Sequence, residues 1–413
     1  MSFNFIHLSD LHLGKKIKSL KGDIDRYDEF YNTFKEIEYI IKQSKCEFII
    51  VSGDIFHNKL PSLEAEELFI NFLINIYELV NYIFIISGNH DSDLKLKNLN
   101  TYNKILNKFS NKKIIIYTFI DLEEYFNNNS NAPYFEFKIN DNNVLIILVP
   151  FIEYRLGLKF HQIFDIEKEY SYSKLHSILL NKILQEKILN KNTLKILVMH
   201  VMLDEVNLGS SESPLCTNDI YKVLSNDIVF DFNYIALGHI HRYQKINTIH
   251  YSGSILPLDF GEDYPHGIIL NKVDHNLITS EFIELKSHKR LITLDLKKTE
   301  NINNLIKQIE DNKNSYIKIK IYDNSESIDI QKLINFENVI KIEKFIKEDK
   351  NLSNQTYELE NQINTLDFSN VLQVYEMYYK ELKISKNEKD LEKIKPKLKK
   401  ILNKLEELIN KEI

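Results

Sequence analysis

The chain has 413 residues, and its composition narrows the class of protein. Hydrophobic residues make up 43% and charged residues 27%, which is typical of a soluble globular protein, and no apolar stretch is long enough to span a bilayer. The two cysteines, Cys46 and Cys216, exclude a disulfide scaffold and a cysteine-built zinc site and favour a reducing compartment. Since the N-terminus lacks the features of a secretion signal, we expect a cytoplasmic protein.

Charge is distributed unevenly along the chain. The net charge at pH 7 is -6, yet residues 1–285 carry 28 Lys and Arg against 37 Asp and Glu, whereas residues 286–350 carry 14 against 11. Nonspecific affinity for nucleic acid depends mainly on Lys and Arg side chains that neutralise phosphates. A polyanionic substrate would therefore need metal ions, a local basic patch or a partner to be held.

Short apolar runs recur over the first 285 residues, and each ends in a small or polar cluster. They predict buried β-strands at Phe3–Leu8, Phe48–Val51, Tyr82–Ile86, Val144–Val149, Leu194–Met199 and Tyr234–Leu237. Helical spacing between several of them, as in Tyr27–Gln43 and Leu63–Leu79, indicates an α/β fold with a sheet covered on both faces. We expect this first domain to span residues 1–285.

A different pattern begins near Ser287. Three strand-like runs alternate with two helix-like runs, at Arg290–Leu296, Ile302–Asp311, Tyr316–Tyr322, Ile330–Ile334 and Val339–Phe345. This alternation predicts a small separate α+β domain over residues 286–350.

The remaining residues, 351–413, are predicted to be helical. Six side chains follow the three-four spacing of an apolar seam, which Pro396 interrupts: Leu391, Ile394, Leu398, Ile401, Leu405 and Leu408. Two interpretations fit this seam, an antiparallel hairpin with Phe368–Leu382 or a helix that docks on a partner's coiled coil. Helical spacing alone does not separate them.

Polar motifs follow five of the predicted strands. They are Ser9-Asp10-Leu11-His12, Gly53-Asp54-Ile55-Phe56-His57, Gly88-Asn89-His90-Asp91, His200 and Gly238-His239-Ile240-His241. In open α/β sheets, functional groups gather at the carboxyl ends of strands. We therefore expect the five motifs to lie close together.

Spacing and glycine usage support this expectation. Residues i and i+2 of an extended segment point to the same side, so Asp10 and His12 can converge on one point, and the same spacing recurs in the last motif. The chain has only ten glycines, yet three of them directly precede a proposed ligand, namely Gly53, Gly88 and Gly238. Glycine at such positions permits a tight turn or a close approach of the backbone.

The motifs offer seven candidate metal ligands of three chemical kinds. They are Asp10, His12, Asp54, Asn89, His200, His239 and His241. Carboxylate, imidazole and amide groups suit manganese, iron or zinc rather than calcium. Seven ligands are too many for one ordinary site, but they suit two divalent ions that share a carboxylate, as in enzymes that hydrolyse phosphate esters.

These motifs resemble the signature of the calcineurin-like metallophosphoesterases. Within that superfamily, SDLHLG at 9–14, GDIFHNKLPS at 53–62, GHIHRYQ at 238–244 and YSGSILPLDFGE at 251–262 are similar to DNA double-strand-break repair nucleases, the family of bacterial SbcD and the meiotic-recombination nuclease. The resemblance covers roughly residues 1–350. It implies a four-layer α/β/β/α sandwich with a small α+β capping domain that contacts DNA, followed by a C-terminal helical segment.

The resemblance also implies roles for individual side chains. The first metal would be held by Asp10, His12 and His241 and the second by Asn89, His200 and His239, with Asp54 bridging. Manganese is the expected ion. His90 would protonate the leaving oxygen or stabilise the developing charge, the alternative being a prop behind the metal ligands. His57, which follows the archaeal and eukaryotic pattern where bacterial members usually have Asp, is linked in the family to positioning of the DNA strand.

The implied function is that of a metal-dependent DNA exonuclease and endonuclease acting on double-strand ends and hairpins. The chain would work as a homodimer inside a heterotetramer with an SbcC-like coiled-coil ATPase, which docks on helices after the cap. Two rival hypotheses remain. One is another phosphoesterase of the superfamily, acting on a nucleotide, lipid precursor or phosphoprotein, and the other is an inactive scaffold of the same fold. The acidic first domain favours the former, and the complete ligand set argues against the latter.

Overall fold

A computed structural model describes residues 2–109, 111–164, 171–185, 193–212, 219–228, 231–297, 302–322 and 330–345. The chain divides into two compact units, residues 1–346 and 347–413, and the described residues all belong to the first. The predicted C-terminal helices lie outside the described residues. Within those ranges, no helix is both long enough and apolar enough to cross a bilayer.

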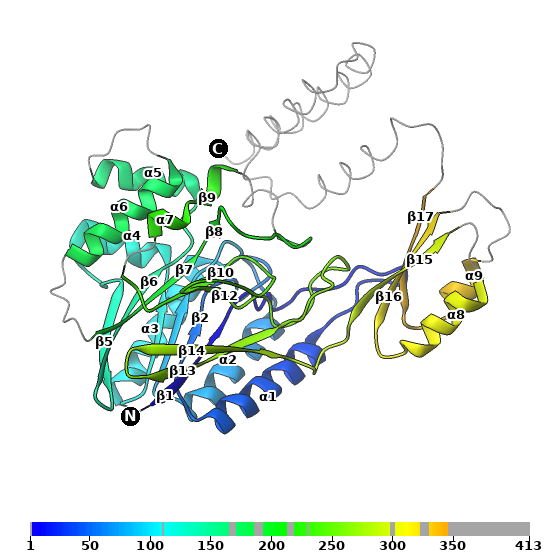
Figure 1. The fold of residues 1–413 in the computed structure, drawn as a ribbon, viewed down its shortest axis with the longest axis horizontal. Helices are drawn as coiled ribbons and strands as arrows, with labels where there is room; N and C mark the ends of the chain where they lie inside the picture. Colours follow the sequence, from blue (N-terminus) through cyan, green and yellow to red (C-terminus); the bar gives the residue numbers. More distant parts are fainter. Residues whose placement is uncertain are drawn as a thin grey trace, which may run out of the picture. The chain divides into compact units, whose positions relative to one another are not determined.

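The first of two six-stranded sheets has the strand order β14-β13-β1-β2-β3-β4 (Figure 1). Its strands are β1 (Phe3–Leu8), β2 (Cys46–Val51), β3 (Tyr82–Ile86), β4 (Lys113–Tyr117), β13 (Gly267–Asp274) and β14 (Leu277–Glu284). Strands β1 to β4 run parallel, and β13 and β14 extend the sheet in antiparallel fashion beside β1.

The second sheet has the order β11-β12-β10-β7-β6-β5. Its strands are β5 (Tyr134–Ile139), β6 (Asn142–Val149), β7 (Thr193–His200), β10 (Tyr234–Gly238), β11 (Gln244–Ile246) and β12 (Ile249–Tyr251). The four inner strands run parallel, and the two edge strands are antiparallel. A separate pair of short strands joins β8 (Met202–Leu203) to β9 (Lys222–Val223).

Helices cover the outer faces of both sheets, which gives the four layers of a metallophosphoesterase sandwich (Figure 1). Helices α1 (Tyr27–Ser44), α2 (Leu63–Tyr77) and α3 (Asp93–Phe109) pack against the first sheet. Helices α4 (Phe119–Asn128), α5 (Tyr154–Ile163), α6 (Tyr172–Gln185) and α7 (Ser225–Ile228) lie beside the second sheet. Phe5, Phe48 and Phe84 of the first sheet belong to the apolar cluster that includes the second sheet.

The six predicted strands and two predicted helices are confirmed, but the strands belong to two sheets rather than one. Each inner strand is apolar on both faces because one face meets helices and the other meets the opposite sheet. Apolar runs alone predict this double burial but do not say which strands pair. Local signals fix some helix ends, since the Ser62 side chain caps α2 and Thr118 with Asp121 forms a capping box at α4.

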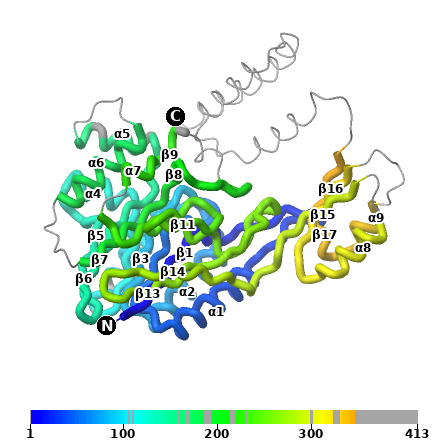
Figure 2. The backbone as a smooth tube through the Cα atoms, viewed as in Figure 1, coloured from blue at the N-terminus to red at the C-terminus, as the bar shows by residue number. Residues whose placement is uncertain are grey.

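A smaller set of elements, which we call the cap, follows β14. It contains β15 (Leu291–Lys297), α8 (Ile302–Asp311), β16 (Tyr316–Tyr322), α9 (Ile330–Ile334) and β17 (Val339–Lys344), so the five elements predicted for this region are confirmed. The three strands form a parallel sheet in the order β15-β16-β17, and Figure 2 traces the chain from β14 into it. The boundaries of the three predicted domains stay a prediction.

A buried ion pair joins the cap to the start of α1. The Glu29 carboxylate accepts hydrogen bonds from Arg26 Nη2 at 2.8 Å, from the Tyr316 hydroxyl at 2.9 Å and from the Lys289 backbone N–H at 3.1 Å. Arg26 also donates to the backbone oxygen of Pro257 at 2.5 Å. Both charges are therefore fully partnered away from water, as buried charges require.

The packing of α1 on α2 generates a stability prediction. The rings of Phe34 and Phe72 are stacked with centroids 4.0 Å apart and are 2% and 1% exposed. Phe34→Ala leaves a cavity in this contact and should lower the free energy of unfolding by about 3–5 kcal/mol. Tyr39→Ala, on the same helix but 64% exposed, should change it by about 0.5 kcal/mol or less. Urea denaturation measures both, and equal midpoints for the two variants would contradict the predicted packing.

Candidate metal centre

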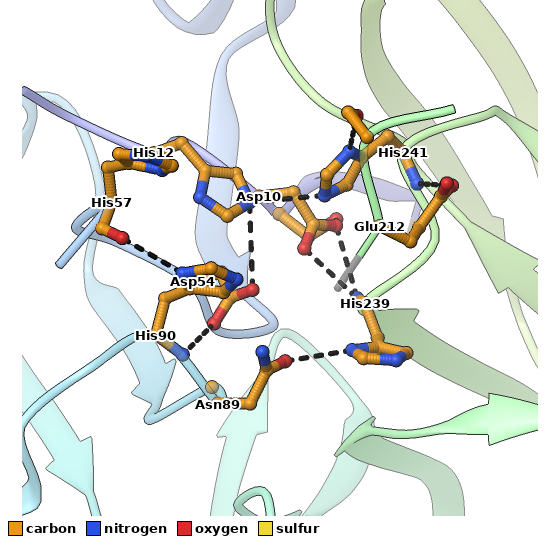
Figure 3. A network of polar contacts seen from close by, with 12 residues as sticks. Asp10, His12, Asp54, His57, Asn89, His90, Glu212, His239 and His241 are labelled. Atoms are coloured by element: carbon orange, nitrogen blue, oxygen red, sulfur yellow. Dashed lines mark hydrogen bonds and ion pairs between the residues drawn. The ribbon is translucent and has the colours of Figure 1, made fainter. Parts of the chain in front are cut away.

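The five motifs meet at the carboxyl ends of strands from both sheets. Asp10 and His12 follow β1, Asp54 follows β2, and Asn89 follows β3, all in the first sheet. His200 is the last residue of β7, and His239 and His241 follow β10, both in the second sheet. Figure 3 shows the side chains of these motifs turned toward a common centre. The structure therefore brings together all seven side chains that the sequence singles out.

One group of potential ligands consists of Asp10, His12 and His241. Their ligand atoms all lie within 4.8 Å of one another, and the two imidazole Nε2 atoms are 3.1 Å apart. The Asp10 carboxylate also accepts hydrogen bonds from the His239 backbone N–H at 3.0 and 3.2 Å. All three side chains are buried.

A second group consists of Asp54, His200 and His239, again with ligand atoms within 4.8 Å of one another. Asn89 completes this group, because its Oδ1 lies 2.9 Å from His200 Nε2 and 2.8 Å from His239 Nδ1. The opposite nitrogen of His200 donates to the Ser52 backbone oxygen at 2.8 Å, which leaves Nε2 free of its proton in the neutral ring. That tautomer is the one a metal ligand needs.

The Asp54 carboxylate lies between the two groups. Its Oδ2 is 3.6 Å from His12 Nε2 and 3.4 Å from His200 Nε2. Its Oδ1 accepts a 2.8 Å hydrogen bond from the His90 backbone N–H. A carboxylate in this position can contribute to both groups, so the donors fit two cations that share one ligand.

The backbone is strained at the same residues. Asp10, His12, Asp54 and His239 have φ values of 52°, 46°, 51° and 96°, in the left-handed region that non-glycine residues seldom occupy. Such conformations persist only where the surrounding structure enforces them, and they cluster at functional sites.

Two glycines allow the loops of the two sheets to approach closely. A Cβ on Gly88 would come within 2.3 Å of the Asp54 backbone nitrogen, and a Cβ on Gly238 would come within 2.0 Å of the Ser52 backbone oxygen. No side chain can be accommodated at either position without moving the backbone. The predicted role of glycine at these two motifs is confirmed.

Burial and neighbouring charges shift the pKa values of the two carboxylates in opposite directions. Burial raises the pKa of Asp10 to about 6, against the lowering effect of His200 and His241. Burial would also raise the pKa of Asp54, but the imidazoles of His200 and His90 hold it well below its usual range. Asp54 is thus the carboxylate that remains charged inside the site.

The histidines divide in the same way. Burial would lower the pKa of His200, but Asp54 raises it to about 9. Burial lowers the pKa of His239 to about 3. The site therefore contains protonated and neutral imidazoles around buried carboxylates, and cations that bind there would displace the imidazole protons.

Sequence reasoning assigned no role to three residues that orient His241. Ser211 Oγ lies 2.5 Å from His241 Nδ1 and donates a hydrogen bond to the Glu262 carboxylate, whose Oε1 is itself 3.3 Å from Nδ1. Glu212 accepts a hydrogen bond from the His241 backbone N–H at 3.2 Å. These contacts favour a proton on Nδ1 and leave Nε2 for a ligand. Glu262 ends the string YSGSILPLDFGE, so its signal was present, whereas nothing in the sequence connects Ser211 with His241.

Asp91 is a further residue to which no role was assigned. Its carboxylate accepts hydrogen bonds from the backbone N–H groups of Ile55, Phe56 and Gly88 at 3.2, 3.0 and 2.9 Å. It thereby ties the loop after β2 to the loop after β3. The signal lay in its motif, where it directly follows His90.

His57 and His90 stand beside the ligands rather than among them. Their ring centroids are 5.6 Å apart, and the His90 ring centroid is 4.8 Å from that of His12. His90 Nδ1 donates to the His57 backbone oxygen at 2.8 Å. Burial and the nearby Lys15 lower the pKa of His57 to about 2, and Lys15 Nζ is 3.4 Å from His57 Nε2.

Comparison with known proteins places this geometry in a family. Two relatives are nucleases by name, the SbcD component of the SbcCD nuclease of Bacillus subtilis (strain 168) and the DNA double-strand break repair protein Mre11 of Methanococcus maripaludis. The first is 26% identical over 266 residues, which cover 62% of each chain, and the second is 26% identical over 324 residues, 75% of this chain and 73% of that protein. An uncharacterized protein of Acanthamoeba polyphaga mimivirus is 26% identical over 298 residues, 68% of this chain but 18% of that protein.

The matched regions cover less than two thirds of the viral and the Bacillus proteins. The model of the family described as calcineurin-like phosphoesterase matches residues 3–243, a range that includes all five motifs. Because this match covers more than half of the chain, the protein belongs to the calcineurin-like phosphoesterases.

Proposed function

We propose that this protein is a metal-dependent phosphodiesterase that cleaves DNA, as exonuclease and endonuclease, within an SbcCD-like double-strand-break repair complex. The observation that carries the proposal is the buried Asp54 carboxylate between two sets of nitrogen and oxygen donors. In the proposed site, Asp10, His12 and His241 hold one ion, Asn89, His200 and His239 hold the other, and Asp54 bridges them. When bound, such a pair supplies charge stabilisation for the attacking and leaving oxygens and a nucleophile at neutral pH. Manganese is the ion we expect, because the donors combine imidazole with carboxylate and amide oxygens.

His90 is proposed to act on the leaving oxygen. Its Nδ1 must carry a proton, because the His57 backbone oxygen that it contacts can only accept a hydrogen bond. Protonation of the ring therefore occurs at Nε2, which is left for the substrate. A group fixed at both its backbone and one ring nitrogen suits proton transfer at a defined position. We propose that His57, next to it, positions the DNA strand.

The nuclease function is preferred to the rival phosphoesterase functions for two reasons. The relatives that cover most of the chain are named as DNA repair nucleases. The cap also gives the protein a second folded region, which hydrolysis of a nucleotide, lipid precursor or phosphoprotein would leave unexplained. An inactive scaffold is disfavoured because all seven proposed ligands are present and converge.

We further propose a coiled-coil ATPase of the SbcC type as the partner and the cytoplasm as the compartment. The acidic first domain supports a partner, since residues 1–285 carry 37 acidic against 28 basic side chains. DNA ends and hairpins would then be held in part by surfaces of the complex rather than by this domain alone. The helices predicted to dock on that partner, within residues 351–413, lie outside the described residues.

The metal proposal predicts a change in stoichiometry when the shared ligand is altered. Asp54→Asn keeps the shape of the side chain but removes its charge, so we expect two Mn²⁺ per chain in the unaltered protein and one or none in the variant. Equilibrium dialysis followed by elemental analysis measures the ratio. Asp141→Asn, on the exposed turn between β5 and β6, is the matched control and should keep two. Two bound ions in Asp54→Asn would contradict the shared-ligand proposal.

The role of His90 predicts that catalysis and metal binding separate. His90→Ala should lower kcat for linear duplex DNA by about 10²–10⁴-fold, because a proton donor is lost, while the bound Mn²⁺ remains. Loss of the ions together with the activity would instead show that His90 is a prop behind the ligands.

The same assay separates the rival functions. A phosphopeptide and bis(p-nitrophenyl) phosphate are tested beside DNA, with and without Mn²⁺. Turnover of the small substrates alone would favour the rival phosphoesterase. Absence of turnover of every substrate, with the partner ATPase present, would favour the scaffold.

A homodimer is the assembly we propose, and exposed apolar side chains support it. Leu63 at the start of α2 is 79% exposed and Tyr102 on α3 is 68% exposed, with Leu60 and Leu94 also exposed. An ion pair between Lys95 and Glu66 holds the first turns of the two helices together. Exposed apolar groups gathered on neighbouring helices are typical of an interface between subunits.

The dimer proposal predicts a change in molar mass in solution. Leu63→Glu combined with Tyr102→Glu should convert a dimer into a monomer, because two charges would be buried at the interface. Size-exclusion chromatography with light scattering gives the mass. Leu277→Glu, at a residue 78% exposed on β14, is the control and should remain dimeric. A monomeric unaltered protein, or a dimeric double variant, would refute the proposal.

A further inference from the structure

The sheet of the cap has one face covered by helices and one face without them. Ile317, Ile319 and Ile321 of β16 point into the apolar core shared with α8 and α9. Because side chains alternate along a strand, the residues between them point to the other side. We call that side the open face, and its described residues are Thr293, Asp295, Lys297, Lys318, Lys320, Tyr322, Lys341, Glu343 and Phe345.

Two aromatic side chains are stacked at the far end of the open face. The rings of Tyr322 and Phe345 have centroids 4.9 Å apart and an interplanar angle of 13°. The two residues are 40% and 36% exposed. Paired rings held flat on a sheet and open to water are a surface on which planar groups can stack.

Lysines surround these rings. Four of the open-face residues are Lys and two are acidic, which gives the face a net positive charge. The single carboxylate of Glu343 is shared, since it lies 3.0 Å from both Lys318 Nζ and Lys341 Nζ. Lys320 sits one step along the strand from Lys318, toward Tyr322. Positive charge beside exposed aromatic rings matches a ligand that combines phosphates with planar bases.

The open face begins beside the candidate metal centre. At its near end Leu291, Tyr316 and Ile340 pack against Ile17 and Phe260 of the first domain. Ile17 follows the His12 motif by five residues, and Phe260 precedes Glu262, which contacts His241. The seven residues of β16 then extend this surface by about 20 Å to the stacked rings.

We propose that the open face of the cap binds single-stranded nucleic acid, with unpaired bases stacked on Tyr322 and Phe345 and phosphates near the lysines. The proposal rests on the proposed function for its direction, because the strand would lead away from the metal centre. A duplex is a poorer fit, since its bases are already stacked on one another and shielded from protein rings. An acidic protein partner would use the lysines but has no equivalent need for the rings.

Binding of a fluorescein-labelled oligo-dT of about 12 nucleotides tests the proposal, with the full chain in EDTA so that no cleavage occurs. Tyr322→Ala and Phe345→Ala should each weaken the affinity by about 5-fold or more, as expected for the loss of one stacked base. Tyr322→Phe should bind as the unaltered protein does, because stacking needs the ring and not the hydroxyl. Fluorescence anisotropy gives the affinity.

The lysines predict a separate signature. Lys318→Gln combined with Lys320→Gln should reduce the slope of log affinity against log salt by about 1.4, as expected for two lost phosphate contacts on a single strand. Tyr39→Ala, an exposed aromatic of α1, is the control and should change neither the affinity nor the slope. Circular dichroism melting curves establish that each variant is folded.

The outcomes separate this proposal from the nuclease function. Absence of oligo-dT binding by the unaltered chain would overturn it, and so would unchanged affinity in Tyr322→Ala and Phe345→Ala. Equal losses of affinity for a duplex of the same length would also overturn it, because they would exclude base stacking. Hydrolysis of bis(p-nitrophenyl) phosphate with Mn²⁺ should be unchanged in all these variants. Its absence in the unaltered chain would count against the proposed hydrolase, whereas the binding losses would still support the open face.

Discussion

The position of the Asp54 carboxylate, buried where two sheets meet, is the constraint on which the candidate metal centre depends. Asp54 comes from the first sheet, whereas His200, 3.4 Å away, comes from the second. His200 is also hydrogen-bonded to the Ser52 backbone oxygen, two residues before Asp54. Any shift of one sheet relative to the other would separate these groups. The apolar core between the sheets therefore stabilises the site as well as the fold.

The loops that carry the ligands are less favourable locally than the strands that precede them. Asp10, His12, Asp54 and His239 adopt positive φ values, and buried carboxylates and imidazoles lie close together. Both features cost free energy, which the packing of the sheets must offset. The conformation is thus enforced by the fold before any cation is bound. Such preorganisation is what metal-assisted chemistry requires of its ligands.

The sequence predicts much of this arrangement because its signals are local. Apolar runs identify the inner strands, and residue types at their carboxyl ends identify all seven proposed ligands. The division into two sheets was not visible in the runs, since pairing depends on contacts between distant segments, and only the family resemblance implied it. Ser211 was missed for the same reason, because its role depends on a contact with His241, thirty residues away. The predicted tail helices lie outside the described residues, so neither interpretation of them is decided.

The distribution of charge gives the two described regions different tasks in the proposed function. The first domain is acidic, and part of that acidity is the buried carboxylates that cations would neutralise. Such a domain can bind metal and exclude water, but its surface repels a polyanion. The cap has a small excess of basic residues and makes direct contact with the loops that adjoin the metal ligands. Chemistry and substrate retention are therefore assigned to separate surfaces, and the buried contacts of Glu29 with Arg26 and Tyr316 hold those surfaces in register.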